Sequence, residues 1–173
     1  MTTAEAASQV RLLILDVDGV LTDGGLQFDN RGEEYKTFNS LDGHGIRMAL
    51  DAGLEVSVIT GRDSAIVRHR MRDLGVERLY QGCRDKREAF DDLLRQTGLE
   101  AVQCAYVGDD LPDLPIMRRV GFAVAVQNAH EFVRHNCDWV TTRPGGKGAV
   151  REVVDFILEA QSLLDRIHRG YLE

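Results

Sequence analysis

The chain has 173 residues, of which 43% are hydrophobic and 28% charged, and its formal net charge is -7. This length is typical of one domain with its own hydrophobic core, so we expect a single domain over residues 1–173. The negative charge argues against general binding to nucleic acid or to an anionic membrane, and no apolar run approaches the roughly 20 residues that cross a bilayer.

Along the chain, short apolar runs alternate with amphipathic stretches. The apolar runs predict buried parallel strands at 12–17, 56–59, 104–107 and 122–126. Helical patterns predict helices at 43–52, 64–74, 87–95 and 114–119, and a last long helix at about 149–167. Strands that alternate with helices predict an α/β fold with a doubly wound parallel sheet.

Two further segments differ from this alternation. Residues 26–28 and 34–38 flank an Asp-Asn-Arg-Gly turn, which predicts a β-hairpin flap over about 25–38, projecting just after the first strand. The last helix and tail occupy about 149–173, and we expect the polar end at 166–173 to be mobile unless a neighbouring subunit holds it.

Acidic residues follow two of the predicted strands at the point where each strand ends. Asp16 lies at the end of the first strand and Asp18 directly after it, and Asp109, Asp110 and Asp113 follow the third. Ligands of open α/β sheets bind at the carboxyl ends of the strands. If the two strands are neighbours, Asp16 and Asp109 face each other and repel unless a cation lies between them, and oxygen ligands favour Mg²⁺. Either loop alone is as compatible with a solvated turn, but the combination indicates a functional site.

A second set of residues could hold a phosphate group. Thr60, Gly61 and Arg62 lie at the end of the second predicted strand, where hydroxyl and backbone donors can bind phosphate oxygens. Lys86 begins a helical pattern and offers a point charge. Alone, Thr60 could be a helix cap and Lys86 a solvated lysine, so their value lies in the order in which they occur.

That order, DxDGxxTD, Thr-Gly-Arg, Lys and GDDxxD, resembles the haloacid dehalogenase superfamily of phosphohydrolases over nearly the whole chain. The resemblance implies that Asp16 is the nucleophile, which forms an aspartyl-phosphate, and that Asp18 is the general acid and base. It implies that Thr60 and Lys86 hold the phosphate. An aspartate at position 18 favours phosphatase over dehalogenase chemistry.

The same resemblance implies a magnesium site. The side chains of Asp16 and Asp109 and the main-chain carbonyl of Asp18 would bind Mg²⁺, while Asp110 and Asp113 would support the site. The gaps between these motifs leave no room for a large cap domain, so a neighbouring subunit is expected to complete the site.

Within the superfamily the chain resembles the family of 3-deoxy-D-manno-octulosonate 8-phosphate (KDO 8-phosphate) phosphatases of lipopolysaccharide biosynthesis. The segments that carry this resemblance are 16–24, 42–46, 59–62, 105–111 and 145–152. It implies a sugar-acid phosphate substrate and a homotetramer in which the hairpin of one subunit caps the next. It also implies that Arg62 and Arg70 contact the sugar-acid carboxylate, with Gly61 in the substrate site.

Several alternatives stay open at the level of sequence. The substrate could be a sialic or other nonulosonic acid 9-phosphate, or the chain could be a phospho-acceptor signalling module. Arg62 could form a surface ion pair and Arg70 could belong to a solvated helical face. Among the histidines, only His44 is expected near substrate. The glycines at 145–148 could approach substrate before a helix N-terminus or form a plain loop.

The three cysteines are far apart and lack CxxC spacing, which argues against a disulfide framework or a zinc site. Because the first residues also lack the basic and apolar pattern of a signal peptide, we expect a cytoplasmic protein.

Overall fold

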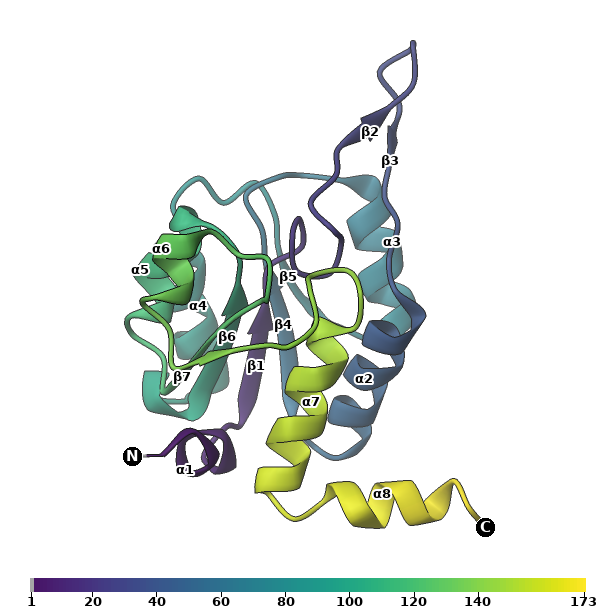
Figure 1. The fold of residues 1–173 in the computed structure, drawn as a ribbon. Coiled ribbons are helices and arrows are strands. Elements are labelled where there is room, and N and C mark those ends of the chain that lie inside the picture. Colours follow the sequence, from purple (N-terminus) through teal and green to yellow (C-terminus); the bar gives the residue numbers. More distant parts are fainter. Residues whose placement is uncertain (1) are drawn as a thin grey trace.

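The computed structural model describes residues 2–173, and Met1 lies outside the described residues. Its centre is a six-stranded parallel sheet in the order β5-β4-β1-β6-β7-β8. The strands are β1 (Leu12–Leu15), β4 (Glu55–Ile59), β5 (Arg78–Tyr80), β6 (Cys104–Gly108), β7 (Phe122–Ala125) and β8 (Trp139–Val140). A separate antiparallel pair, β2 (Gln27–Phe28) and β3 (Glu34–Tyr35), forms the hairpin that projects beyond the sheet (Figure 1).

Helices cover both faces of this sheet (Figure 1). Helices α2 (Ser40–Asp51) and α7 (Ala149–Ala160) pack together on one face, and α4 (Lys86–Thr97) packs with α5 (Leu114–Met117) on the other. The helices are α1 (Thr3–Ser8), α2 (Ser40–Asp51), α3 (Ala65–Leu74), α4 (Lys86–Thr97), α5 (Leu114–Met117), α6 (Glu131–Arg134), α7 (Ala149–Ala160) and α8 (Leu164–Gly170), with short 3₁₀ helices at Ala101–Gln103 and Leu111–Asp113.

The central strands lie in the core because helices cover them on both sides. All four residues of β1 and all five of β6 are buried, which explains why these strands have continuous apolar runs and not alternating patterns. The predicted α/β fold with a doubly wound parallel sheet, a projecting hairpin and no large cap is therefore confirmed. Within residues 2–173, no helix combines the length and apolarity needed to cross a membrane.

The predicted last helix differs from the structure, where it is two helices. Ser162 adopts a left-handed conformation with φ 59°, and the N–H of Leu163 donates to the carbonyl of Leu158, which ends α7. The chain then turns into α8, which runs away from the sheet (Figure 1). The apolar pattern continues through the break and contains no glycine or proline there, so the sequence carries no signal for this turn.

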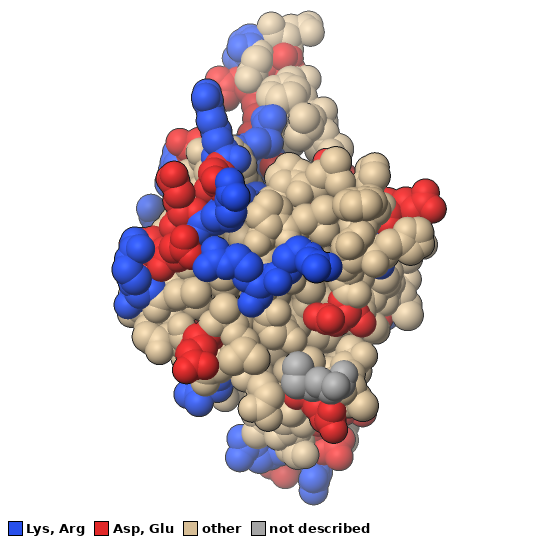
Figure 2. All heavy atoms as spheres, turned by 90° about the vertical axis from the view of Figure 1, so that its left-hand side faces the viewer, with Lys and Arg blue, Asp and Glu red and all other residues tan. Residues whose placement is uncertain are grey.

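The side of the molecule that carries α4, α5 and α6 bears charges of both signs (Figure 2). Exposed ion pairs join neighbouring residues on these helices, with nitrogen–oxygen distances of 2.6 to 3.0 Å; they are Arg119–Asp91, Arg87–Asp85 and Arg95–Asp92. Exposed pairs of this kind contribute little to stability.

Candidate active site

The carboxyl ends of three neighbouring strands bring the predicted residues together. Strand β1 lies between β4 and β6, and Leu15 pairs with Val58 on one side and Val107 on the other. The residues that follow these strands therefore meet at one edge of the sheet. They surround a cavity of about 280 Å³ lined by Asp16, Asp18, Thr60, Gly61, Arg62, Lys86, Asp109, Asp110, Pro112 and Asp113. Of the residues predicted for catalysis, metal binding and substrate binding, all except Arg70 lie in this lining, and His44, which was expected near substrate, also lies outside it.

Three carboxylates converge in the cavity. One oxygen from each of Asp16, Asp109 and Asp113 lies within 4.8 Å of the other two. Gly19 makes this approach possible, because a Cβ at that position would lie 2.0 Å from Oδ2 of Asp109. Burial and the charge of Asp113 raise the pKa of Asp16 to about 6 and the pKa of Asp109 to about 7, and Lys86 only partly offsets these effects. Three crowded oxygen donors fit a hard divalent cation such as Mg²⁺, which would relieve their repulsion.

The ammonium group of Lys86 is buried against two of these carboxylates. Lys86 is the first residue of α4, and its Nζ lies 3.0 Å from Oδ1 of Asp16 and 2.7 Å from Oδ1 of Asp113. Burial lowers the pKa of Lys86, but the charges of Asp16 and Asp113 outweigh burial and raise it. The lysine is therefore positively charged beside the candidate nucleophile.

Asp113 organises the loop that follows β6. Its side chain is fully buried, and Oδ2 accepts hydrogen bonds from the main-chain N–H groups of Asp109 at 2.9 Å and Asp110 at 3.2 Å. The carboxylate of Asp110 accepts from the N–H of Leu111 at 2.8 Å and so caps the short helix that begins there. Asp113 thus fixes the position of Asp109, while Asp110 shapes the same loop.

Tyr106 is a contact of this site that sequence reasoning missed. Its hydroxyl donates to Oδ1 of Asp113 at 2.7 Å and accepts from Nζ of Lys86 at 3.1 Å. Burial and the charge of Asp113 raise the pKa of this phenol well above its usual value. The sequence did contain one indication of this contact, because Tyr106 carries the only hydroxyl in the apolar strand at 104–107. A buried tyrosine hydroxyl usually needs a hydrogen-bond partner.

The base of the hairpin also reaches the cavity. Nζ of Lys36 lies 2.5 Å from Oδ1 of Asp18 and 3.2 Å from Oε1 of Glu34, and the Lys36 side chain is only 2% exposed. Arg62 lies 2.7 Å from the same Glu34 oxygen and 3.8 Å from Oδ2 of Asp18. Sequence reasoning missed Lys36 and Glu34, although residues two apart on a strand share a face. The hairpin is therefore linked to the candidate general acid, and Arg62 forms an ion pair within one subunit.

Arg70 lies outside the cavity, between α2 and α3. A Cβ on Gly43 would lie 2.2 Å from Nη2 of Arg70, and the guanidinium lies 5.9 Å from the ring centre of Phe38. Its buried Nε has no hydrogen-bond partner among residues 2–173.

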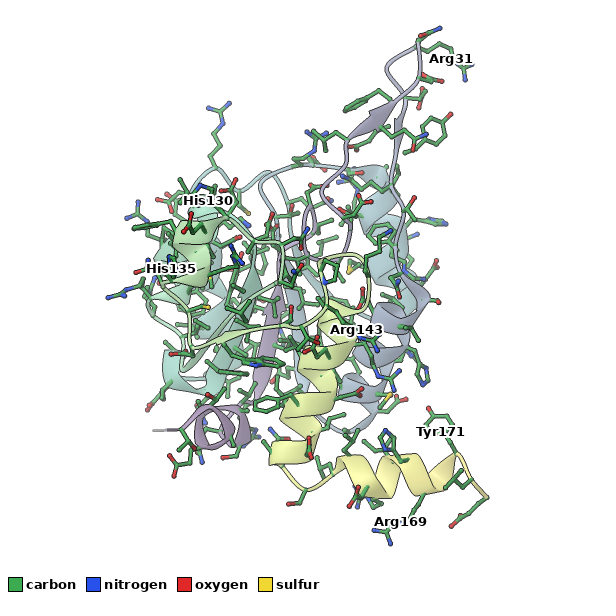
Figure 3. The ribbon with its side chains drawn as sticks, in the orientation of Figure 1. Arg31, His130, His135, Arg143, Arg169 and Tyr171 are labelled. Carbon is green, nitrogen blue, oxygen red and sulfur yellow. The ribbon has the colours of Figure 1, made fainter. Side chains whose placement is uncertain are left out.

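His44 does not lie near the carboxylates. Its Nε2 is 3.1 Å from the hydroxyl of Tyr171. Figure 3 shows Tyr171 beside α8, at the end of the molecule opposite to the hairpin tip with Arg31. The expectation that His44 contacts substrate is therefore not met within one subunit. At the end of the chain, which was expected to be mobile, residues up to Gly170 form α8.

The glycine-rich loop at 145–148 packs against the loop that follows β1. A Cβ on Gly145 would lie 1.7 Å from the carbonyl oxygen of Gly19, and the N–H of Gly146 donates to the carbonyl of Val20 at 2.9 Å. The first catalytic loop can therefore pack directly against this second loop. This close approach of two backbones explains Gly145 and Gly146. The alternatives open from the sequence were only an approach to substrate or a plain loop.

Asp42 occupies the helix N-terminus that was considered for an anionic ligand. Its carboxylate accepts from the N–H groups of Arg151 at 2.9 Å and Gly148 at 3.3 Å, at the start of α7. Gly45 lets the two helices approach, since a Cβ there would lie 3.0 Å from Cδ of Arg151. The Asp-Gly-His-Gly segment thus joins α2 to α7, and its aspartate takes the place of a bound anion.

A larger hollow of about 440 Å³ lies elsewhere, beside α7, and is lined in part by Trp139, Arg143 and Phe156. Figure 3 shows Arg143 in the segment that leads into α7. The lining of this hollow contains none of the converging carboxylates. We therefore assign the candidate active site to the smaller cavity, because that cavity holds the reactive side chains.

Comparisons with known proteins identify the family of this chain. The model of the haloacid dehalogenase-like hydrolase family matches residues 79–153. The 3-deoxy-D-manno-octulosonate 8-phosphate phosphatase of Salmonella typhi is 52% identical over 165 residues, which cover 95% of this chain and 86% of that protein.

Solved structures extend the similarity to three dimensions. A probable phosphatase of the YrbI family from Pseudomonas syringae is 48% identical, with a TM-score of 0.98 over 99% of this chain and 97% of that one. The 3-deoxy-D-manno-octulosonate 8-phosphate phosphatase of Moraxella catarrhalis, solved with magnesium, phosphate and KDO, is 40% identical, with a TM-score of 0.95 over 98% of this chain and 97% of that one. These relatives are hydrolases and lend no support to a signalling module. The chain belongs to the haloacid dehalogenase-like hydrolases and, among them, to the family of 3-deoxy-D-manno-octulosonate 8-phosphate phosphatases.

Proposed function

We propose that this protein is a magnesium-dependent phosphomonoesterase that hydrolyses KDO 8-phosphate to KDO and inorganic phosphate. The observation that carries the proposal is the convergence of Asp16, Asp109 and Asp113 within 4.8 Å beside the buried ammonium of Lys86. Family membership supports the substrate, and the Moraxella relative holds magnesium, phosphate and KDO. We place the reaction in the cytoplasm, within lipopolysaccharide biosynthesis.

The residues of the cavity fit a magnesium ion. Asp16, Asp109 and the main-chain carbonyl of Asp18 would hold it, with Asp110 and Asp113 fixing the loop on one side. The donors are oxygen atoms, as Mg²⁺ prefers. When bound, the ion would neutralise part of the charge on the carboxylates and the phosphate.

In the first step, a carboxylate oxygen of Asp16 attacks phosphorus. The new bond joins Asp16 to phosphorus while the bond from phosphorus to the sugar oxygen breaks, and Asp18 gives its proton to that leaving oxygen. Lys86 and Thr60 hold the phosphate oxygens, so that developing charge is stabilised.

In the second step, water replaces the enzyme at phosphorus. Asp18, now a carboxylate, accepts a proton from the water as its oxygen bonds to phosphorus and the bond to Asp16 breaks. The products are inorganic phosphate and the free Asp16 carboxylate, and Asp18 is protonated again.

We further propose that the sugar acid is recognised at the base of the hairpin. Arg62 and Gly61 line the cavity, and Arg62 can exchange Glu34 for a substrate carboxylate, which a guanidinium binds through two parallel hydrogen bonds. Arg70 is the second proposed contact of the sugar acid; it lies outside this cavity, and its buried Nε has no hydrogen-bond partner among residues 2–173. The cavity is open, and a neighbouring subunit of a homotetramer would complete it with its own hairpin.

A panel of phosphate esters tests the proposal. It contains KDO 8-phosphate, a nonulosonic acid 9-phosphate, an unrelated hexose phosphate and an aryl phosphate, each assayed with Mg²⁺ and with a chelator. We expect the highest kcat/KM for KDO 8-phosphate and loss of phosphate release with chelator. Preference for the 9-phosphate would identify the alternative substrate, and turnover that survives chelation would contradict the metal-dependent mechanism.

A further inference from the structure

The hydroxyl of Tyr106 is a buried polar group for which packing gives no reason. Tyr106 is fully buried in the middle of β6, between Ala105 and Val107. A phenylalanine would present the same ring to the core and would avoid the cost of burying a hydroxyl. The position of the oxygen, and not the ring, therefore needs an explanation.

The hydroxyl closes a triangle with an ammonium group and a carboxylate. Its oxygen lies 3.1 Å from Nζ of Lys86 and 2.7 Å from Oδ1 of Asp113, while these two groups are 2.7 Å apart. Nζ also lies 3.0 Å from Asp16. The three N–H bonds of Lys86 thus have three partners, of which Tyr106 and Asp113 approach from within the fold and Asp16 from the cavity.

The geometry points to Tyr106 as a positioning residue for the phosphoryl-transfer reaction: its hydroxyl aims the Lys86 ammonium at Asp16 and at the phosphate that Asp16 attacks. The inference rests on the proposed function of the site. Without the hydroxyl, Asp113 is the only inner partner of Lys86, and the ammonium can move toward it and away from the cavity. Oδ1 of Asp113 also loses a donor, although Oδ2 keeps its two main-chain contacts.

The test replaces only the oxygen, with Tyr106→Phe. Tyr80→Phe is the matched control, because it removes a hydroxyl that donates to Asp92 of α4 at 2.9 Å from the edge strand β5, outside the cavity. We expect Tyr106→Phe to lower kcat for KDO 8-phosphate by about 10- to 100-fold, as removal of a supporting contact does at other sites, with little change in KM. Tyr80→Phe should keep the wild-type kcat.

Two further readouts separate positioning from a loss of folded protein. Orthovanadate imitates the five-coordinate phosphorus, so its inhibition constant should rise with the fall in kcat, whereas misfolded molecules would lower kcat without changing this constant. In the Lys86→Ala background, Tyr106→Phe should have no further effect, because it acts through that lysine.

The outcomes are distinguishable. A wild-type protein without phosphatase activity on the ester panel would refute the proposed function itself. A wild-type protein that is active, with a Tyr106→Phe variant whose kcat and vanadate inhibition constant stay within two-fold of wild type, would overturn the role of Tyr106. Equal losses from Tyr106→Phe in the presence and absence of Lys86 would also overturn it.

Discussion

The Nζ atom of Lys86 lies 3.0 Å from Oδ1 of Asp16, and both side chains are buried at the edge of the sheet. The lysine neutralises only part of the local charge, because Asp113 binds the same ammonium and Asp109 lies nearby. Burial and the charge of Asp113 outweigh the effect of Lys86 and raise the pKa of Asp16 to about 6. A nucleophilic carboxylate at neutral pH needs a further positive charge, which a divalent cation supplies.

Replacing Asp18 with asparagine tests general acid and base catalysis. Asp18→Asn retains the shape of the side chain but cannot donate or accept the proton, so kcat for KDO 8-phosphate should fall by about 10² to 10⁴. The loss should be smaller for an aryl phosphate, whose leaving group needs no protonation. Steady-state kinetics on both esters checks this, and equal losses would argue against a role in protonating the leaving oxygen.

Magnesium should stabilise the protein more at high pH. The pKa values of Asp16 and Asp109 rise from 3.8 to about 6 and about 7 in the fold, so the metal-free folded state holds protons that the unfolded chain releases. The contribution of these two carboxyl groups to the free energy of unfolding must therefore fall as pH rises from about 4 to about 7. Mg²⁺ binds the ionised carboxylates, so the rise in Tm that it causes should be larger at pH 8 than at pH 5.

Thermal unfolding with Mg²⁺ and with chelator at the two pH values measures this effect. Asp109→Asn is the control, since it removes a proposed ligand and should abolish most of the magnesium-dependent shift. A shift of the same size at pH 5 and pH 8 would mean that these carboxylates do not bind the ion.

The exposed apolar side chains of the hairpin should matter for assembly. Leu26 and Phe28 are 52% and 51% exposed, and apolar surface of this kind marks a protein contact. The double change Leu26→Ser and Phe28→Ser should convert the proposed homotetramer to smaller species and reduce turnover of KDO 8-phosphate more than turnover of an aryl phosphate. Phe132→Ser, at a residue 56% exposed on α6, is the control. Light scattering that finds the same oligomer in all three proteins would reject the capping role.

The close approach of two loops predicts a stability effect. Gly145→Ala places a methyl group where the carbonyl oxygen of Gly19 lies, so the loops must separate at a cost of about 1 to 3 kcal/mol. Gly170→Ala meets no atom within 4 Å and should be nearly neutral. Urea unfolding measures both variants, and equal stabilities would show that the loops separate without cost.

The sequence predicts the parts of the site that depend on strand order. Asp16, Thr60 and Asp109 each follow an apolar run, and parallel strands deliver such residues to one edge. Their meeting therefore needs only the assumption that the strands are neighbours.

Other contacts depend on how distant segments pack, and local patterns do not contain them. Lys36 reaches Asp18 only because the hairpin folds back at its base, and Asp42 caps a helix that begins more than a hundred residues later. Tyr106 points its hydroxyl at Asp113 from an apolar strand. The break at Ser162 has no marker because the apolar pattern runs through it.

Trapping the covalent intermediate tests the central claim most directly. Borohydride reduces an acyl phosphate to an alcohol, so a pulse of borohydride during turnover of KDO 8-phosphate with Mg²⁺ should convert Asp16 to homoserine, which mass spectrometry of the peptide detects. Asp16→Asn should lack both the product and the turnover, and chelator should remove both from the wild type. Full turnover with no reduced residue at position 16, or with reduction at Asp109 instead, would contradict the account.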